Sequence, residues 1–458
     1  MSWTVPVALY GWIPLVVIAF ATMSPLRAVL LSYFAGWMFL PVASIEALGF
    51  FDYSKSTAIP LIVFIAIVAF DGQSLSRLRV SWLDLPVAVF CCVPLFTSLS
   101  NGLGWYDGVS ASLYQSIIWG LPYLTGRLYF ASPESAKELA LAMLAAGVVY
   151  APLCLWEIRM SPQLHATLYG FHQHEWVQTL RGGGFRPMVF MQHGLMVGLW
   201  MCAASLVGLA LWTSGELRRF WGIPMALLVP ALIATTVWCK SFGAIGLLLI
   251  GALCLWTMRN WRTSLPMLVL VCIPVVYVSA RVSGSWAGGG IVESVARISE
   301  QRAASLEFRI SSEERLRVRA AEKPLLGWGG WNRSLTRSTD DRENRNLTTI
   351  DSLWIIVFGK NGFVGLASLM LCFLLPVITL WRRCPPALWD QPRAIWPWTI
   401  AMVLSLYALD SLVNAMVNPV YFLMAGGLCG LAPVRERVVA RVAALRAKPR
   451  TLVGAPQP

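Results

Sequence analysis

The sequence predicts an all-α protein whose helices cross a membrane many times. Hydrophobic residues make up 57% of the 458 residues and charged residues only 13%, about half the charged share of a typical soluble domain. The mean hydropathy is +0.64. A soluble enzyme or a disordered chain would need more charge than this, so both classes are excluded. The apolar runs are continuous rather than alternating, which argues against a transmembrane β-barrel.

Apolar runs suitable for membrane helices recur along the whole chain. A span needs about 20 apolar residues, and because two of the thirteen runs are short we expect twelve or thirteen spans. The runs lie at 4–22, 28–49, 57–70, 82–99, 110–130, 137–156, 187–212, 220–238, 241–258, 264–280, 350–381, 396–412 and 418–432. Residues 1–280 thus carry ten spans and 350–432 carry three, separated by a hydrophilic loop at 281–349 and followed by a basic tail at 433–458.

Basic residues predict the orientation, because Lys and Arg stay on the cytoplasmic side. They concentrate at alternate connections and in the tail, which is consistent with thirteen spans and an external N-terminus. The connections 157–186 and 281–349 then face outward. The net charge of +13 is explained by this topology. We expect no nucleic-acid partner, since no basic soluble domain is present to bind one.

The first outward connection is rich in His and Arg. All four His of the chain lie between His165 and His193, but their spacing does not match a metal site, so no metal is predicted. Arg181 and Arg186 flank a Gly-rich turn ahead of the next span. His193 is either a substrate-binding residue or a core histidine with satisfied hydrogen bonds.

Lys240 lies at the next outward turn, between two spans. It faces the same predicted side as the basic residues of 281–349. One interpretation is a functional cation; the alternative is a lysine that reaches from a helix end to the membrane interface.

The loop 281–349 has 12 basic and 9 acidic residues. Outward loops usually carry few basic residues, so we expect the arginines of this loop to have a function. The segments 294–306 and 312–322 have helical composition, with Ser311 or Ser312 as a cap for the second.

Three arginines of this loop form a candidate diphosphate site. Arg315 and Arg319 share a helix face, and Arg309 lies just before the expected cap. Guanidinium groups match phosphate oxygens in a bidentate manner. The alternative is a solvated helix with Glu–Arg pairs.

Two further motifs follow. The Gly-rich stretch 324–331 contains Trp328, whose ring suits a sugar face or a membrane interface, although a simple helix stop is the alternative. Asp351 lies where the loop becomes an apolar helix; it is a candidate functional residue or an N-cap.

In this order, the motifs resemble those of the O-antigen ligases and the O-antigen and exopolysaccharide polymerases. Members commonly have an Arg/Gly/Pro stretch like 181–187, a Pro-Leu-hydrophobic-Gly-x-Gly stop like 324–329, and a Gly-hydrophobic-hydrophobic-Gly-Leu end like 362–366. The resemblance covers the architecture of most of the chain, and the motifs cover about 180–366. The ligases' loop His corresponds to Asp351 here, as in the polymerase branch, and their turn Arg falls on Phe242.

The resemblance implies a GT-C-like fold and a metal-independent glycosyltransferase without a cofactor, on the outer face of the bacterial inner membrane. Its donor is a glycan on undecaprenyl diphosphate, and its acceptor is another carrier-linked glycan or, in a ligase, lipid A–core. The candidate catalytic residues are Asp351 as base, with Arg309 and Lys240 as cations for the leaving diphosphate. The candidate substrate-binding residues are Arg181, Arg186, His193, Arg315, Arg319 and Trp328. A non-catalytic binder or transporter of lipid-linked glycan is the alternative.

Overall fold

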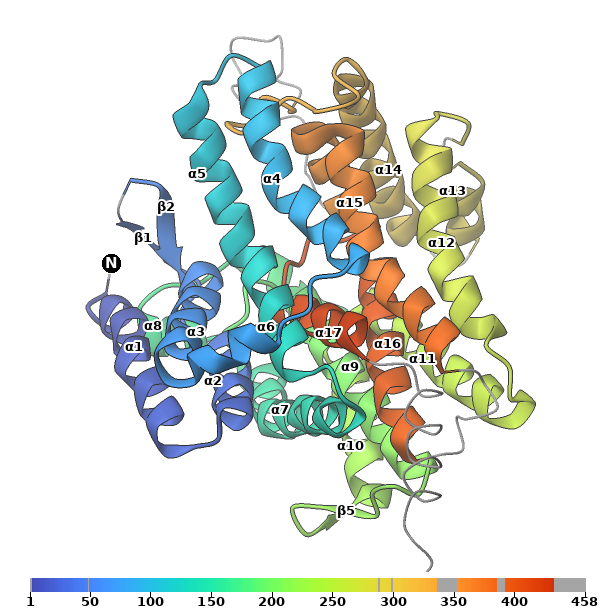
Figure 1. Ribbon diagram of the computed structural model, residues 1–458. Coiled ribbons are helices and arrows are strands. Elements are labelled where there is room, and N and C mark those ends of the chain that lie inside the picture. Colours follow the sequence, from blue (N-terminus) through green and yellow to red (C-terminus); the bar gives the residue numbers. More distant parts are fainter. Residues whose placement is uncertain are drawn as a thin grey trace, which may run out of the picture.

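The computed structural model is a bundle of helices, and it describes residues 2–47, 49–286, 289–297, 300–335, 352–384 and 392–431 (Figure 1). The predicted tail 433–458 therefore lies outside the described residues. The first helices are α1 Thr4–Thr22, α2 Pro25–Phe39, α3 Lys55–Asp71, α4 Leu85–Ser100, α5 Trp105–Gln115, α6 Leu121–Tyr129, α7 Pro133–Met160 and α8 Leu164–Tyr169. The later helices are α9 Gly194–Thr213, α10 Met225–Trp238, α11 Phe242–Trp261, α12 Leu265–Val282, α13 Gly289–Ala296, α14 Glu300–Ala321, α15 Leu353–Arg383, α16 Pro392–Asp410 and α17 Pro419–Gly430.

Short elements join these helices. Three antiparallel hairpins pair β1 Ser44–Ala47 with β2 Phe51–Ser54, β3 Leu180–Arg181 with β4 Gly184–Phe185, and β5 Arg219–Phe220 with β6 Ile223–Pro224. The 3₁₀ turns are η1 Gly72–Arg77, η2 Trp82–Asp84 and η4 Trp176–Thr179, and η3 Ser116–Gly120 is a π-helical turn.

Eight of the helical segments within the described residues are long and apolar enough to cross a membrane. They are Thr4–Thr22, Lys55–Arg77, Trp82–Ser100, Pro133–Met160, Gly194–Thr213, Phe242–Trp261, Leu265–Val282 and Leu353–Arg383. The prediction of an all-α, multi-pass membrane protein in a lipid bilayer is confirmed at this level. Three more apolar helices are shorter, Met225–Trp238, Ala394–Asp410 and Pro419–Gly430, so the count of twelve or thirteen spans stays a prediction.

Besides the run 350–381, whose helix α15 is broken at Gly362, two predicted runs are not single helices. The run 28–49 leaves the helical state after Phe39, because Pro41 follows and disfavours helix at the residue before it. The chain then forms the β1–β2 hairpin. The run 110–130 passes from α5 through a π-helical turn at 116–120 into α6.

Helix α9 forms the centre of the bundle. It packs against α7, α10, α11 and α16, and almost all of its side chains are buried. Helix α17 lies between α6, α15 and α16, near the middle of the view in Figure 1. A helix that is apolar on all sides has its stable place inside such a bundle.

Helix α15 is broken at Gly362, where φ is 62° and ψ is −162°, a conformation that essentially only glycine adopts. The break exposes backbone carbonyls, which need partners. Trp328 N donates to Gly359 O at 2.9 Å, and Gly329 N donates to Lys360 O at 2.9 Å. The stretch 324–329 therefore packs by its backbone against the break in α15.

Glycine is required on both sides of this contact. A Cβ at Gly362 would lie 2.3 Å from the carbonyl carbon of Leu325, and a Cβ at Gly327 would lie 2.5 Å from Lys360 O. No real Cβ contact is that short, and the obstructing atoms belong to the backbone. The two Gly motifs singled out in the sequence thus form one backbone joint.

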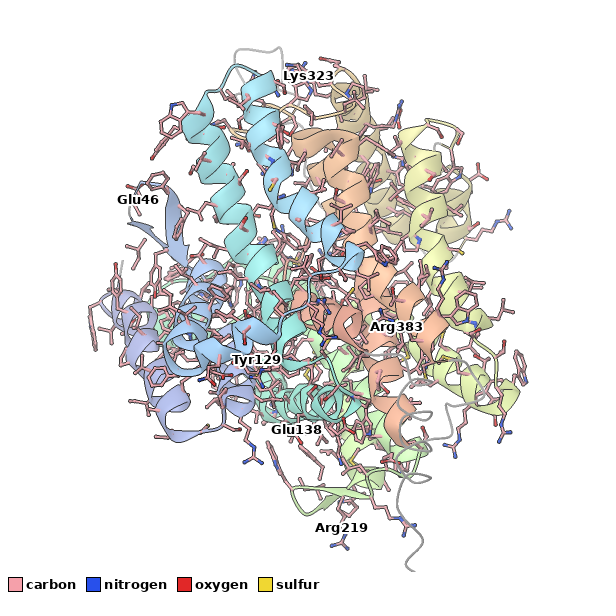
Figure 2. All side chains as sticks on the ribbon, viewed as in Figure 1. Glu46, Tyr129, Glu138, Arg219, Lys323 and Arg383 are labelled. Atoms are coloured by element: carbon pink, nitrogen blue, oxygen red, sulfur yellow. The ribbon has the colours of Figure 1, made fainter. Side chains whose placement is uncertain are left out.

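Two basic residues that the predicted topology places on opposite sides of the membrane lie far apart in the bundle. Lys323, from the predicted outward loop, lies at one end of the bundle, and Arg219, from a predicted cytoplasmic connection, lies at the other (Figure 2). This pair fits the predicted orientation, whereas Arg383, from another predicted cytoplasmic connection, lies about midway along the bundle in the same view (Figure 2).

Candidate functional site

Helix α14 runs without interruption from Glu300 to Ala321. The helical composition predicted at 294–306 and 312–322 is therefore confirmed in part, but the predicted break between them, with a cap at Ser311 or Ser312, is wrong. Ser311 Oγ donates to Phe308 O at 3.0 Å, a bond that serine makes within a helix to the preceding turn. Arg309 consequently lies inside the same helix as Arg315 and Arg319.

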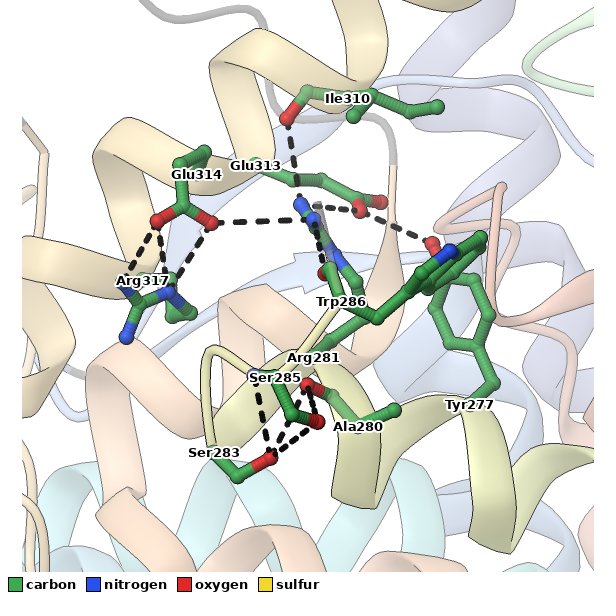
Figure 3. Close-up of polar contacts among 10 residues, drawn as sticks. All are labelled: Tyr277, Ala280, Arg281, Ser283, Ser285, Trp286, Ile310, Glu313, Glu314 and Arg317. Atoms are coloured by element: carbon green, nitrogen blue, oxygen red, sulfur yellow. Dashed lines mark hydrogen bonds and ion pairs between the residues drawn. The ribbon is translucent and has the colours of Figure 1, made fainter. Parts of the chain in front are cut away.

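A buried network fixes α14 to α12 (Figure 3). Arg281, only 1% exposed, donates to Ile310 O at 3.2 Å and to Trp286 O at 3.2 Å. It also forms ion pairs with Glu313 at 3.5 Å and Glu314 at 3.8 Å. A buried charge is stable only when its partners are in place. The contacts of Arg281 therefore fix α14 to α12 at Ile310, Glu313 and Glu314, within about one helical turn of Arg309.

Glu313 extends this network to the start of α15. Its carboxylate accepts hydrogen bonds from Tyr277 Oη at 3.1 Å and from Ser352 Oγ. Burial raises the pKa of Glu313, while Ser352 and Arg281 act in the opposite direction. Asp351 itself lies outside the described residues. Neither Arg281 nor Glu313 was singled out in the sequence, because a Glu–Arg pair on a polar helix looks solvated.

The β3–β4 turn lies against Lys240. Lys240 Nζ donates to Gly182 O at 3.4 Å, and a Cβ at Gly184 would lie 2.4 Å from Nζ. Lys240 has a φ of 51°, which strains a residue with a side chain. The turn that contains Lys240, before α11, thus contacts the Gly-rich turn 182–184. This contact between distant segments could not be predicted from the sequence.

Arg186 is the most deeply buried of the predicted site cations, with 8% exposure. Its Nη2 donates to Lys240 O at 3.1 Å, and its side chain covers Gly194, where a Cβ would lie 2.3 Å from Arg186 Cδ. Its Nε has no hydrogen-bond partner among the described residues. No carboxylate in the described part of the chain forms an ion pair with it.

Other cations surround Arg186. Burial and, to a smaller extent, the positive charges of Arg181 and Arg309 together lower its pKa to about 10. Arg186 therefore remains charged at neutral pH. Residues from three distant segments converge here, and we call Arg181, Arg186, Lys240 and Arg309 the cation cluster.

His193 borders this cluster as the N-cap of α9. Its Nδ1 accepts from Leu195 N at 3.0 Å, so its Nε2 carries the proton and donates to Gln178 Oε1 at 3.1 Å. Burial lowers its pKa to about 3, with further contributions from His174 and Arg186. The ring is neutral at pH 7 and both nitrogens are engaged; a role in substrate binding stays a prediction. Gln178 carried no signal in the sequence.

Asp410 is the carboxylate on which Arg309 acts within the described residues of the site. It is buried at the end of α16, and the charge of Arg309 reaches it. Asn414 Nδ2 donates to Asp410 Oδ1 at 2.7 Å. The sequence shows Asp410 as an acidic residue between apolar spans, but not that the charge of Arg309, from a loop helix, acts on it.

Arg319 and Trp328 form a separate contact. The guanidinium of Arg319 lies 3.5 Å from the Trp328 ring centroid, and Lys323 Nζ lies 4.5 Å from it. Trp328 Nε1 donates to Arg319 O at 2.8 Å, and Arg319 pairs with Glu322 at 2.5 Å. Arg315 is exposed. None of these residues has a described contact with the cation cluster, so their role in substrate binding stays a prediction.

The cation cluster suits an anion with several oxygens. Like charges in a partly buried site repel one another, and an anionic ligand would remove that cost. Guanidinium groups and the N-terminus of α9 supply donors for such an anion. Among the described residues, no three His, Cys, Asp or Glu side chains are grouped to hold a metal ion.

No protein-family model matches the chain, and no curated protein matches it either.

Proposed function

We propose that this protein is a membrane glycosyltransferase that polymerises glycan carried on undecaprenyl diphosphate, at the outer face of the bacterial inner membrane. The supporting observation is Arg186, a buried cation beside Arg181 and Arg309 whose Nε has no partner among the described residues. A diphosphate is the lipid-borne anion that fits several guanidinium groups at once.

The chemistry needs no cofactor, because the donor is already activated. The bond between the anomeric carbon and the diphosphate oxygen breaks, and the acceptor hydroxyl oxygen bonds to that carbon. The cation cluster stabilises the charge that grows on the leaving diphosphate. Asp351 is the proposed base that takes the hydroxyl proton.

Gene deletion tests this function in cells. We expect the deletion to leave carrier-linked single repeat units and to abolish the polymer, and the wild-type gene to restore it. Arg309→Ala should not restore polymer, and Arg309→Lys should do so poorly, because a point charge does not replace a bidentate fork. Arg297→Ala, on an exposed residue outside the cation cluster, is the matched control and should behave as wild type. Normal polymer in the deletion strain would contradict the proposal.

The break in α15 favours a second candidate, a non-catalytic transporter or binder of the same lipid-linked glycan. Discontinuous membrane helices are common at the substrate sites of transporters. In this case the deletion strain would accumulate single repeat units on the inner side of the membrane. Accumulation on the outer side, with no polymer, supports the transferase.

A further inference from the structure

An irregular segment carries two of the site residues. Residues 186–193, here called the 186–193 segment, join β4 to α9 and contain no helix. Four consecutive residues of the segment, from Met188 to Met191, are each at most 7% exposed, and Val189 has a φ of 51°. Buried backbone outside a helix must find its hydrogen-bond partners elsewhere.

Glu157 satisfies the amides of this segment. It lies near the end of α7 and is 1% exposed. Its Oε2 accepts from Met188 N at 2.8 Å and from Val189 N at 2.7 Å. Its Oε1 accepts from Leu164 N at 3.0 Å. The carboxylate therefore replaces the helical acceptors that the segment lacks.

Lys55, a cation where Glu157 is an anion, donates a hydrogen bond to a backbone carbonyl of the same segment. It begins α3 and is 4% exposed. Its Nζ donates to Phe190 O at 2.9 Å and to Trp37 O at 3.3 Å, and it lies 4.8 Å from the Trp37 ring centroid. No carboxylate in the described part of the chain forms an ion pair with it.

Two neutral side chains complete the support. Tyr150 Oη accepts from Phe190 N at 3.1 Å. Gln173 Nε2 donates to Val189 O at 3.1 Å and to Met191 O at 3.2 Å. Side chains from α3, α7 and the stretch after α8 thus hold one irregular segment.

We infer that Glu157 and Lys55 are positioning residues for Arg186 and His193, the two ends of the 186–193 segment. Burying a carboxylate and an ammonium costs several kcal/mol each, and a regular helix would need neither. The burial of Glu157 and Lys55 is explained if both residues keep the 186–193 segment irregular, so that Arg186 points toward a bound anion. This inference rests on the proposed function, because it assigns the anion to a lipid diphosphate.

The consequence for the site is geometric. Arg186 packs over Gly194 and bonds to Lys240 O, so a shift of the segment moves the guanidinium relative to the rest of the cation cluster. Displacement of a binding group by about 1 Å costs about 10²-fold in rate. Glu157 and Lys55 act through the backbone and need not touch the ligand.

The test uses farnesyl diphosphate as the probe and purified full-length protein in detergent. Glu157→Gln and Lys55→Met should each weaken binding about 10–100-fold, the usual loss when a residue that orients a ligand-binding group is replaced. Their matched controls are Asp84→Asn, which removes a carboxylate bonded to Tyr123 and Arg127, and Lys137→Met, an exposed lysine over Trp396. Both controls should bind as wild type.

Hydrogen exchange separates positioning from general stability. In Glu157→Gln the amides of Met188 and Val189 should exchange faster while α9 keeps its protection. If either principal variant does not fold, Gln173→Ala is the milder substitute, since it removes only the donors to Val189 O and Met191 O.

Three outcomes are distinguishable. Weak binding by variants whose exchange changes only in the 186–193 segment supports the inference. Wild-type affinity in those variants overturns it and leaves the proposed function standing. Failure of the wild-type protein to bind the diphosphate contradicts the proposed function and overturns the inference with it.

Discussion

At the scale of single residues, the central feature of the candidate site is the buried Arg186. Arg186 is buried beside two other arginines and has an unsatisfied Nε among the described residues. His193, in contrast, has both ring nitrogens engaged. Arg186 therefore keeps a donor for the proposed anion, whereas the ring nitrogens of His193 are used to cap α9 and to bond Gln178.

The pKa of His193 predicts how stability depends on pH. Its folded pKa of about 3 lies below the ordinary value of 6.5, so only the unfolded chain takes up this proton between those values. The stability contribution of His193 is complete above pH 6.5 and is lost as the pH falls toward 3. At pH 5 the loss is about 2 kcal/mol.

Thermal unfolding at pH 7.5 and pH 5 measures this loss. His193→Asn keeps a helix-capping side chain but cannot be protonated, so its melting temperature should fall less than that of wild type. His165, whose pKa burial lowers to about 4, contributes equally to both proteins. An identical fall in both would show that His193 is not the titrating group.

Asp351 gives the sharpest prediction for the chemistry, although it lies outside the described residues. Asp351→Asn keeps the size of the side chain and much of its capping ability, so stability should change by less than about 1 kcal/mol. Turnover should fall by about 10²–10⁴-fold, the range for loss of a general base. Transfer of labelled glycan by the purified variant measures this, and near-normal turnover would leave Asp351 as a cap.

At the scale of elements, the site depends on joints between helices. Arg281 and Glu313 fix α14 to α12 and to the start of α15. The stretch 324–329 is held by the break in α15 and by α4, where Thr97 Oγ1 donates to Leu326 O at 2.7 Å. These joints determine where α14 presents Arg309.

Gly362 tests the joint in α15. Gly362→Ala should destabilise the protein by at least about 1–3 kcal/mol, because its backbone conformation is strained for any residue with a Cβ and the Cβ would meet Leu325. Gly246→Ala is the matched control, since nothing lies within 4 Å of its position in α11; it should stabilise by about 0.5–1 kcal/mol. Comparison of melting temperatures decides, and equal values for both variants would contradict the joint.

At the scale of the whole molecule, the protein is a multi-pass helical bundle. The fold class could be predicted from the composition, because a chain with 57% hydrophobic and 13% charged residues has too few charged residues to cover the surface of a soluble protein. The breaks at Phe39 and Gly362 did not follow, since both interrupt continuous apolar runs. They are set by Pro41 and by a backbone contact with a distant loop.

The candidate site was predictable in part. Charged residues next to apolar runs stand out in a sequence, which identified Arg181, Arg186 and Lys240, and the excess of arginines in the loop 281–349 identified Arg309. Their convergence depends on tertiary packing. Glu157 and Lys55 were missed because a single charge at a helix end also suits the membrane interface. Asp410 was visible as a polar residue between the last two spans, but the electrostatic effect of Arg309 on it depends on tertiary packing.

The topology is tested with cysteines at the two ends of the bundle. Lys323→Cys and Arg219→Cys are placed in a chain whose exposed native thiols, Cys92 and Cys272, are replaced by Ser. A membrane-impermeant thiol reagent added to intact cells should label the first variant and not the second, which should react only after the cells are opened. Labelling of both from outside, or of Arg219→Cys alone, would contradict the predicted orientation.

Chain growth on the lipid carrier tests the central claim most directly. Purified protein in lipid vesicles is incubated with a labelled repeat unit on undecaprenyl diphosphate, and the length of the carrier-linked glycan is measured together with free undecaprenyl diphosphate. We expect products with more than one repeat unit, one released carrier for each bond formed, and neither in Arg186→Ala or Arg309→Ala. Recovery of the donor unchanged with the wild-type protein, or equal chain growth in both arginine variants, would contradict glycan transfer at the cation cluster.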